Sequence, residues 1–237
     1  DAVVGARVAL PADVAHRFAR VLRLDSGESI ELFDDAGRVV VGRFESPDHV
    51  EVVSVADVDD ALPPLVVVQA LTKTDKLELV VQKATELGAS QIVLFAARRC
   101  QVKLDDERGD KKIVRLTRIA QDAARQCGRA RPPVVTGPLH LKEAIEVARS
   151  VVLSGGVAFA GVVDAEHTLS TWLSQRPAQM KQGGLVVIGP EGGLDPDEQQ
   201  RFAEAGVVGV RFSRHVLRTE TAALAALAIC QAALGEA

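Results

Sequence analysis

The sequence predicts an α/β protein with two domains, a small β-barrel domain at residues 1–62 and a larger domain with a parallel sheet at residues 63–237. The beginning of the chain contains short alternating or β-branched segments separated by turn-forming residues, a pattern typical of a small β-barrel. After Pro64, continuous apolar segments alternate with helical periodicity, which indicates a parallel sheet with crossover helices. The polar stretch that ends in Pro63-Pro64 is predicted to be a linker, because tandem prolines stiffen the chain and cannot serve a central strand.

The first domain is expected to contain one helix and three strands. The helix has Pro11 in its first turn and ends near Leu22. Turns at residues 34–37 and 46–48 are rich in Asp, Gly and Pro, and they separate the strands. The strands are predicted at residues 29–33, 38–44 and 49–55.

The second domain begins with a strand, a helix and another strand. Residues 65–71 and 91–95 are continuous apolar segments, as expected of buried strands. Between them, Thr74 or Asp75 is expected to cap a helix that ends at Gly88. This spacing implies a parallel pair of strands joined by a right-handed crossover.

The alternation of strands and helices continues to the end of the sequence. Asp195, Pro196 and Glu198 form a typical helix start, and a strand is expected between this helix and residue 217. The other expected elements are helices at 110–127, 142–149 and 222–234 and strands at 157–163 and 185–188.

The composition indicates a globular cytoplasmic protein in a reducing compartment. Of its 237 residues, 47% are apolar and 25% are charged, and no apolar segment reaches the length of about 18 residues that spans a bilayer. No signal peptide is recognisable, but the chain begins at Asp1 rather than Met, so we expect further residues to precede it. Cys100, Cys127 and Cys230 are far apart and have no His at ligand spacing, which argues against a disulfide framework and a metal site.

Basic residues are concentrated in one part of the chain. The net charge is −4, but residues 98–131 contain 11 Lys or Arg against 5 acidic residues. Within the predicted helix at 110–127 and just after it, cations recur at helical spacing and share one face. This basic stripe is either a phosphate-binding surface or the solvated side of an amphipathic helix; Arg98, Arg99 and Arg131 flank it, and both interpretations stay open. The stripe consists of Lys111, Arg115, Arg118, Arg125 and Arg129.

A glycine-rich loop, Gly189-Pro190-Glu191-Gly192-Gly193, follows the predicted strand at residues 185–188. In α/β sheets, ligands bind where the carboxyl end of a strand opens into a loop. Glycines allow positive φ and a close approach of the backbone, so the loop is either a ligand site or a tight turn from strand to helix. The spacing is neither GxGxxG nor GxxxxGKS/T, so it supports neither a Rossmann dinucleotide site nor a P-loop.

Several motifs occur in order along the chain, and together they are far more specific than any one of them. They are residues 16–23, 72–76, 82–88, 124–129, 188–193 and 217–222. This set resembles the family of small-subunit ribosomal RNA methyltransferase E, a group within the SPOUT superfamily. Residues 16–23 are similar to part of the family's PUA-like RNA-binding module.

The resemblance implies a fold, a reaction and a cofactor. SPOUT domains have an α/β sheet whose end forms a trefoil knot, an exception to the rule against knots, and they usually act as homodimers. The family methylates N3 of a uridine in 16S ribosomal RNA, which implies a substrate within the small ribosomal subunit. The methyl donor would be S-adenosylmethionine, held by three loops. The implied binding residues are Leu71 and Thr72, then Gly189, Glu191 and Gly192, then Ser213, Val216, Leu217 and Thr219.

Arg218 and Glu191 are the candidate catalytic residues. Uridine N3 becomes nucleophilic as its proton leaves, so an enzyme can accept that proton or stabilise the charge that spreads over the flanking oxygens. Arg218 cannot act as a base at neutral pH, but its guanidinium can donate to those oxygens or to a phosphate. Glu191 either accepts the proton, positions the substrate or accepts hydrogen bonds from loop amides. Thr219 and Thr221 are expected to cap the last helix.

The candidate RNA-binding residues are arginines of both domains. They are Arg17, Arg20 and Arg23 in the first domain and Arg115, Arg118, Arg125 and Arg129 in the basic stripe. Ser213 and His215 depart from the family pattern, in which Gly and a basic side chain are common, so the geometry of the third loop stays open. Two alternative functions also stay open: methylation of a ribose 2′-hydroxyl or a transfer RNA guanine, and RNA binding without catalysis.

Overall fold

The structure, a computed structural model, describes residues 2–33, 38–57, 63–101 and 106–235. The chain divides into two compact units, Asp1–Ala61 with Gly128–Arg131, and Leu62–Cys127 with Pro132–Ala237. The turn expected at residues 34–37 and the part of the expected linker at residues 58–62 lie outside the described residues. The domain boundary between residues 62 and 63 therefore stays a prediction.

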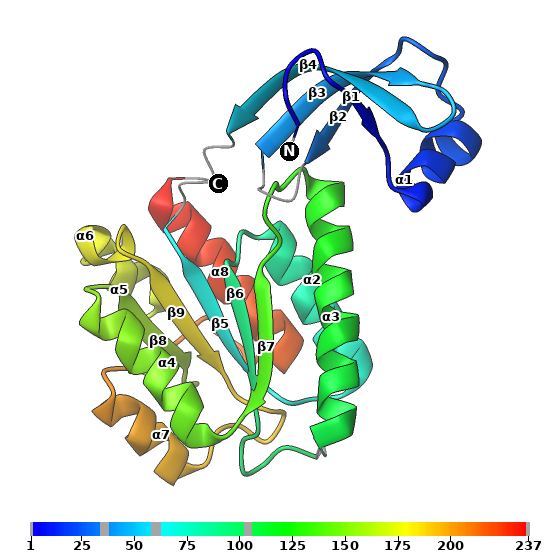
Figure 1. Cartoon of the computed structure of the whole chain (residues 1–237). Helices are drawn as coiled ribbons and strands as arrows, with labels where there is room; N and C mark the ends of the chain where they lie inside the picture. Colours follow the sequence, from blue (N-terminus) through cyan, green and yellow to red (C-terminus); the bar gives the residue numbers. More distant parts are fainter. Residues whose placement is uncertain (1, 34–37, 58–62, 102–105, 236–237) are drawn as a thin grey trace. The chain divides into compact units, whose positions relative to one another are not determined.

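The first unit contains a four-stranded antiparallel sheet with the order β1-β4-β3-β2 (Figure 1). The sequence predicted β2, β3 and β4, but it did not predict β1, because three residues are too few to show an alternating pattern. The strands are β1 (Arg7–Ala9), β2 (Ser29–Phe33), β3 (Arg38–Glu45) and β4 (His49–Asp57).

A short helix packs on this sheet and completes a small core. The predicted helix is present as α1 (Ala12–His16), which continues into the π-helical segment η1 (Arg17–Leu22). Phe18 meets the buried Phe44 edge to face, with the ring centroids 5.9 Å apart. The apolar faces of helix and sheet therefore bury each other, as a unit of this size requires.

The second unit contains a six-stranded sheet with the order β10-β8-β9-β5-β6-β7, in which every neighbouring pair is parallel. The predicted parallel pairing of β5 with β6 is confirmed. The strands are β5 (Leu65–Ala70), β6 (Gln91–Phe95), β7 (Val134–Leu139), β8 (Val157–Gly161), β9 (Gly184–Ile188) and β10 (Val208–Val210). The sequence did not predict β7, because it contains Gly137-Pro138, and such a pair normally indicates a turn. At the edge of the sheet a proline is tolerated.

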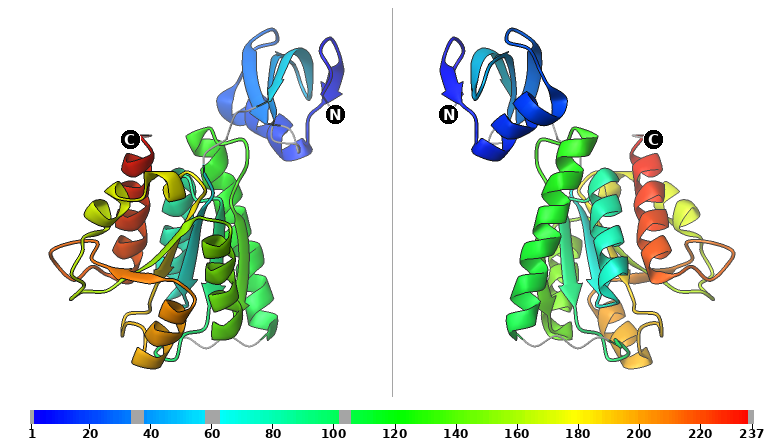
Figure 2. Two further views of the ribbon diagram at one scale, coloured as in Figure 1. Left: turned by 90° about the vertical axis from the view of Figure 1, so that its left-hand side faces the viewer. Right: turned by 90° about the vertical axis from the view of Figure 1, so that its right-hand side faces the viewer.

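Helices cover both faces of this sheet (Figure 2). One face is packed by α2 (Thr74–Glu86), α3 (Asp106–Cys127), α5 (Leu169–Ser174), α6 (Pro177–Met180) and α8 (Thr219–Leu234), and the other by α4 (Leu141–Leu153) and α7 (Pro196–Glu204). Two covered faces explain why the strands read as continuous apolar segments rather than alternating ones. The short helices α5 and α6 were not predicted, since neither is long enough to show helical periodicity.

The helix ends test the predicted capping residues. Asp195 begins α7 as expected, and the Glu198 carboxylate accepts its backbone N–H at 2.9 Å, which completes a capping box. Gly88, with φ +82°, follows the end of α2 as expected. The prediction that Thr74 or Asp75 caps α2 is wrong: the residue at the cap position is Lys73, which makes no side-chain cap bond.

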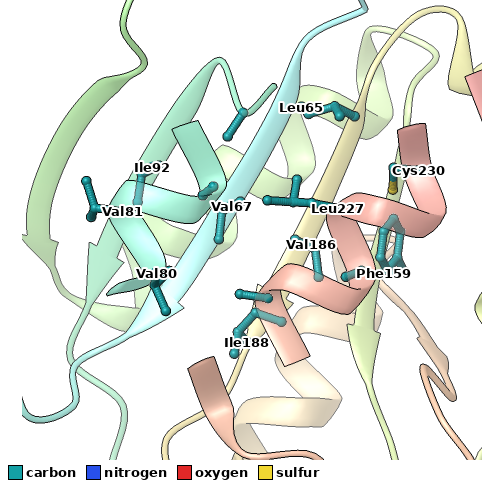
Figure 3. Packing of buried hydrophobic residues seen from close by; sticks show 14 of the residues in the cluster. Leu65, Val67, Val80, Val81, Ile92, Phe159, Val186, Ile188, Leu227 and Cys230 are labelled. Atoms are coloured by element: carbon teal, nitrogen blue, oxygen red, sulfur yellow. The ribbon is translucent and has the colours of Figure 1, made fainter. Parts of the chain in front are cut away.

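The core of the second unit lies between the sheet and α8 (Figure 3). Leu227 of α8 packs with Val67 of β5 and Val186 of β9, and each of these side chains is at most 2% exposed. Burial of each such side chain is worth about 1.5–3 kcal/mol. Burial also raises the pKa of the Cys230 thiol to about 12, so this cysteine is an inert core residue. Among the described residues, the helices are too short or too polar to cross a membrane.

Candidate active site

A cavity of about 760 Å³ lies at the carboxyl ends of β8 and β9. These strands are neighbours in the sheet, so the loops that follow them emerge side by side. The volume of the cavity is typical of small-molecule sites, which span about 300–1,000 Å³. The lining consists of residues 161–164 after β8, residues 187–194 of β9 and the glycine loop, residues 216–219 before and in α8, and Lys76, Gln199, Phe212 and Ala222.

Most of the residues predicted to bind the cofactor or to act in catalysis line this cavity. Those that do are Gly189, Glu191, Gly192, Val216, Leu217, Arg218 and Thr219. Leu71, Thr72 and Ser213 are not among the lining residues. Thr72 is only 1% exposed, and its hydroxyl instead donates a hydrogen bond to Glu191 at 2.5 Å. The loop after β5 therefore contributes by holding the glycine loop.

The segment after β8 forms one wall of the cavity, and the sequence analysis did not predict it. Gly161, Val162, Val163 and Asp164 lie there. The strand was predicted at residues 157–163, so most of this segment was assigned to the strand itself. Because β8 ends at Gly161, the residues after it form a loop to which the argument for the glycine loop also applies. Phe212 was also missed, and its ring meets that of Phe159 in the core with the centroids 6.0 Å apart.

The glycine loop is a tight turn that also faces the cavity. Gly193 has φ +70°, a conformation that favours glycine, and its N–H donates to the carbonyl of Pro190 at 2.8 Å. A Cβ on Gly189 would come within 3.0 Å of the backbone nitrogen of Leu194, so a side chain there would crowd the turn. The two interpretations of the loop, turn and ligand site, are therefore compatible.

Glu191 is held by one group from the loop after β5 and one from the first turn of α2. Its carboxylate accepts hydrogen bonds from the Thr72 hydroxyl at 2.5 Å and the Lys76 ammonium at 3.0 Å. These bonds, the one from Thr72 first, lower the pKa of Glu191 from 4.5 to about 2, and the bond to Glu191 raises the pKa of Lys76. Lys76 also lies 3.6 Å from a carboxylate oxygen of Glu220 in the first turn of α8. This network joins three segments around the cavity.

A second set of contacts joins the glycine loop and the start of α7 to the residues after β6. Arg98 donates through its backbone to the buried Glu198 carboxylate at 2.7 Å and through its guanidinium to Asp195 at 2.9 Å. Arg99 donates to the carbonyl of Gly192 at 3.1 Å. The sequence analysis counted both arginines with the basic patch that could attract RNA. The structure instead pairs them with the loop and the start of α7.

Thr219 does not cap the last helix. The cap position is occupied by Arg218, which makes no side-chain cap bond, so the prediction that Thr219 and Thr221 cap α8 is wrong. The Thr219 hydroxyl donates across to the carbonyl of Gly189 at 2.8 Å. Arg218 is exposed at the cavity, and within the described part of the chain its guanidinium forms no ion pair.

The basic stripe on α3 is only partly free. Arg115 forms an ion pair with Glu78 of α2, from its Nε to Oε1 at 2.8 Å, and Arg125 pairs with Asp122 of its own helix. Arg118 is exposed and has no partner among the described residues. Arg129 has interactions of its own and is half-buried. In the first unit, the arginines on and after η1 are exposed: Arg17, Arg20 and Arg23.

Comparison with known proteins identifies relatives over nearly the whole chain. Residues 60–231 match the family described as RNA methyltransferase domain. Proteins named ribosomal RNA small subunit methyltransferase E from Mycobacterium bovis and Bacillus subtilis are 34% and 33% identical, covering 94% and 90% of this chain and 85% and 84% of their own.

Solved structures show the same fold. The crystal structure of a ribosomal RNA small subunit methyltransferase E from Neisseria gonorrhoeae, bound to S-adenosyl methionine, has a TM-score of 0.84 at 28% identity and covers 98% of this chain and 94% of its own. A putative methyltransferase from Legionella pneumophila, also bound to this cofactor, has a TM-score of 0.83 at 28% identity with the same coverage. The cavity, the loops around it and these relatives lead to one conclusion: the chain belongs to the RNA methyltransferase family, and within it to the family of ribosomal RNA small subunit methyltransferase E.

Proposed function

We propose that this protein transfers a methyl group from S-adenosylmethionine to N3 of a uridine in 16S ribosomal RNA. One observation carries the proposal: the cavity after β8 and β9 brings the glycine loop together with residues 216–219, two segments that the family resemblance assigned to the cofactor. Relatives with this fold bind the same cofactor. The choice of N3 rests on the resemblance of the motifs.

The residues around the cavity fit S-adenosylmethionine. Apolar side chains of Val162, Ile188 and Phe212 can contact the adenine ring and methylene groups, and the tight glycine loop allows the backbone to approach closely. Carboxylates of Asp164 and Glu191 at the rim complement the positive charges of the cofactor. The cofactor supplies an electrophilic methyl group on a sulfonium.

Arg218 is assigned the role of stabilising the uridine anion. Its backbone begins α8, and its exposed side chain at the cavity is free to donate to the oxygens that flank N3. Preorganised donors of this kind are typically worth about 10²–10³ in rate. The proton leaves as the anion forms, and Arg218, which stays protonated, lowers the cost of that ionisation rather than accepting the proton.

Glu191 is assigned a positioning role. A carboxylate whose pKa is about 2 is a weak base near neutral pH, and both of its hydrogen bonds come from the loop after β5 and from α2. Its ionised form holds the glycine loop against these elements. The proton acceptor is then solvent, or a group of the RNA itself.

The remaining parts of the proposal concern the substrate and the assembly. The antiparallel sheet of the first unit supports a PUA-like barrel that binds RNA, with Arg17, Arg20 and Arg23 as the contacting residues. Arg118 is the RNA-binding candidate of the basic stripe that has no partner among the described residues, and Arg115, Arg125 and Arg129 are the other candidates. We further infer a trefoil knot in the second unit, a homodimer, a substrate in the small ribosomal subunit and therefore a cytoplasmic location; family resemblance supports each.

Methylation of small ribosomal subunits tests the proposal directly. The protein is incubated with labelled S-adenosylmethionine and either subunits or naked 16S RNA, and the modified nucleoside is identified by mass spectrometry. N3-methyluridine is expected. A ribose methyl group or a methylguanine would favour another RNA methyltransferase, and no affinity for the cofactor in calorimetry would favour RNA binding without catalysis. Arg218→Ala is expected to abolish methylation while cofactor binding stays measurable.

A further inference from the structure

Gln69 is a polar residue buried in the apolar core of the second unit. It belongs to β5, where all six residues are buried, and its own exposure is 0%. Alternation along the strand gives it the same face as Leu65, Val67 and Leu71, which belong to the core cluster beneath α8. A buried amide costs stability unless it is fully hydrogen-bonded, so an aliphatic side chain would suit this position better on packing grounds alone.

The hydrogen bonds of Gln69 form a one-way chain towards the glycine loop. Its Nε2 donates to the carbonyl of Ala70 at 2.9 Å and to the hydroxyl of Thr219 at 3.0 Å. The Thr219 hydroxyl donates in turn to the carbonyl of Gly189 at 2.8 Å. A carbonyl can only accept and a hydroxyl has a single proton, so Thr219 must receive its other bond from the amide of Gln69. The orientation of that amide is therefore fixed.

The carbonyl of Gly189 is the acceptor through which Thr219 contacts the glycine loop. The next residue is Pro190, which has no N–H, so this carbonyl is the only hydrogen-bonding group of the peptide that joins them. Gly189 and Thr219 both line the cavity, whereas Gln69 does not. Gln69 thus lies beneath the cavity, and its side-chain amide reaches the lining through the bond to Thr219.

The hydrogen bonds of the Gln69 side chain are all made by its amide nitrogen. The Oε1 atom is buried and has no hydrogen-bond partner among the described residues. Of the two bonds from Nε2, the one that leaves β5 is directed at Thr219 and, through Thr219, at the glycine loop.

We propose that Gln69 is a positioning residue for methyl transfer: through Thr219 it fixes the Gly189 carbonyl and the spacing between the glycine loop and the start of α8, where Arg218 stands. The inference rests on the proposed function, since it concerns the same cavity. It predicts that the Gln69–Thr219–Gly189 chain affects cofactor binding and turnover more than it affects folding.

The test compares variants of nearly equal shape in the full-length protein. Gln69→Leu removes the amide, Thr219→Val removes the hydroxyl, and Thr219→Ser keeps the hydroxyl. Thr85→Val is the matched control, because Thr85 is equally buried and donates to the carbonyl of Val81 within α2, away from the cavity. For each variant we would measure the melting temperature without cofactor, the affinity for S-adenosylmethionine by calorimetry, and kcat and KM for methylation of small ribosomal subunits.

Gln69→Leu and Thr219→Val are each expected to lower cofactor affinity and kcat by about tenfold, the loss that one well-placed hydrogen bond implies. The melting temperature of Gln69→Leu should equal or exceed that of the wild type, and the KM for the ribosomal substrate should stay the same. Thr219→Ser, which keeps the hydroxyl, should lose less cofactor affinity and kcat than Thr219→Val, and Thr85→Val should retain cofactor affinity and kcat. The double variant should have nearly the same cofactor affinity and kcat as either single variant, because both substitutions interrupt the same series of hydrogen bonds.

The results that would contradict the inference differ from the result that would contradict the proposed function. If Gln69→Leu melts at a lower temperature but binds the cofactor like the wild type, Gln69 is a structural residue and the inference is wrong. If Gln69→Leu does not fold, normal cofactor affinity and kcat of Thr219→Val would overturn it equally well. If the wild-type protein does not bind S-adenosylmethionine at all, the proposed function fails, and that result is separate from any difference between variants.

Discussion

Replacing Glu191 by Gln is expected to slow methylation by less than about tenfold. The substitution removes the negative charge of the glycine loop but keeps an oxygen that can accept the same hydrogen bonds. Those bonds come from the Thr72 hydroxyl at 2.5 Å and the Lys76 ammonium at 3.0 Å. Lys76 keeps a second carboxylate, that of Glu220 at 3.6 Å, so it is not left without an acidic neighbour.

The magnitude follows from the exposure of the ion pair. The side chains of Lys76 and Glu191 are 21% and 27% exposed, so water screens part of their attraction. Ion pairs that water reaches are worth up to about 1 kcal/mol, which corresponds to about fivefold in a rate or an affinity. A general base contributes far more, typically about 10²–10⁴ in rate. The two roles of Glu191 therefore differ by at least one order of magnitude in their predicted effect.

Single-turnover methylation is the suitable assay, because it separates the chemical step from product release. Wild-type or Glu191→Gln protein, in excess over the small ribosomal subunits, is mixed with them and with saturating labelled S-adenosylmethionine across a range of pH. Both rates should rise with pH in parallel, since the uridine proton leaves more readily in base whichever residue holds the loop. A loss of a thousandfold with unchanged cofactor affinity would refute the positioning role and make Glu191 the proton acceptor.

Three further predictions concern pH, RNA and the core. Because the folded-state pKa of Glu191 is about 2 rather than 4.5, its stabilising contribution is complete above pH 4.5 and is lost as pH falls towards 2. The wild type should then lose more thermal stability than Glu191→Gln between about pH 5 and pH 3, and equal losses would contradict the lowered pKa. Arg118→Ala should weaken RNA binding and reduce by about one unit the slope of log affinity against log salt concentration. Arg115→Ala should change this slope less, because the guanidinium of Arg115 is held by Glu78. An unchanged slope for Arg118→Ala would mean that the stripe is the solvated face of the helix. Phe159→Ala should cost about 3–5 kcal/mol in urea unfolding, because the ring is 1% exposed and contacts two other aromatic rings; a cost below about 1 kcal/mol would mean that the core closes over the gap.

The sequence was most informative where structure depends on local pattern. β5, α2 and β6 begin and end within a few residues of the expected positions, and α7 begins where expected, because apolar periodicity, a capping box and Gly88 are all short-range signals. The edge strand β7 was not predicted, because the prediction used these short-range signals alone. Its Gly137-Pro138 pair obeys a local rule for turns, and only its place at the sheet edge allows it in a strand.

The candidate site was only half predictable. Motifs that resemble the family drew attention to the glycine loop and residues 217–222, but that the segment after β8 meets the glycine loop at one cavity follows only once β8 is known to neighbour β9. The partner of a charged side chain can also lie far away in the sequence. Arg98 and its partner Asp195 are 97 positions apart, so a count of charges along the chain could not reveal that the two neutralise each other.

The bonds around the cavity have a consequence for how the protein is made. Gln69 and Thr219 are 150 positions apart, and Thr72 and Glu191 are 119 apart, so the site closes some of the longest loops in the chain. Long loop closures slow folding, and a newly synthesised chain adopts its earlier elements first. A ribosome that is still translating this protein therefore carries β5 and α2 without the glycine loop or α8. The cavity is therefore complete only after α8 has been synthesised.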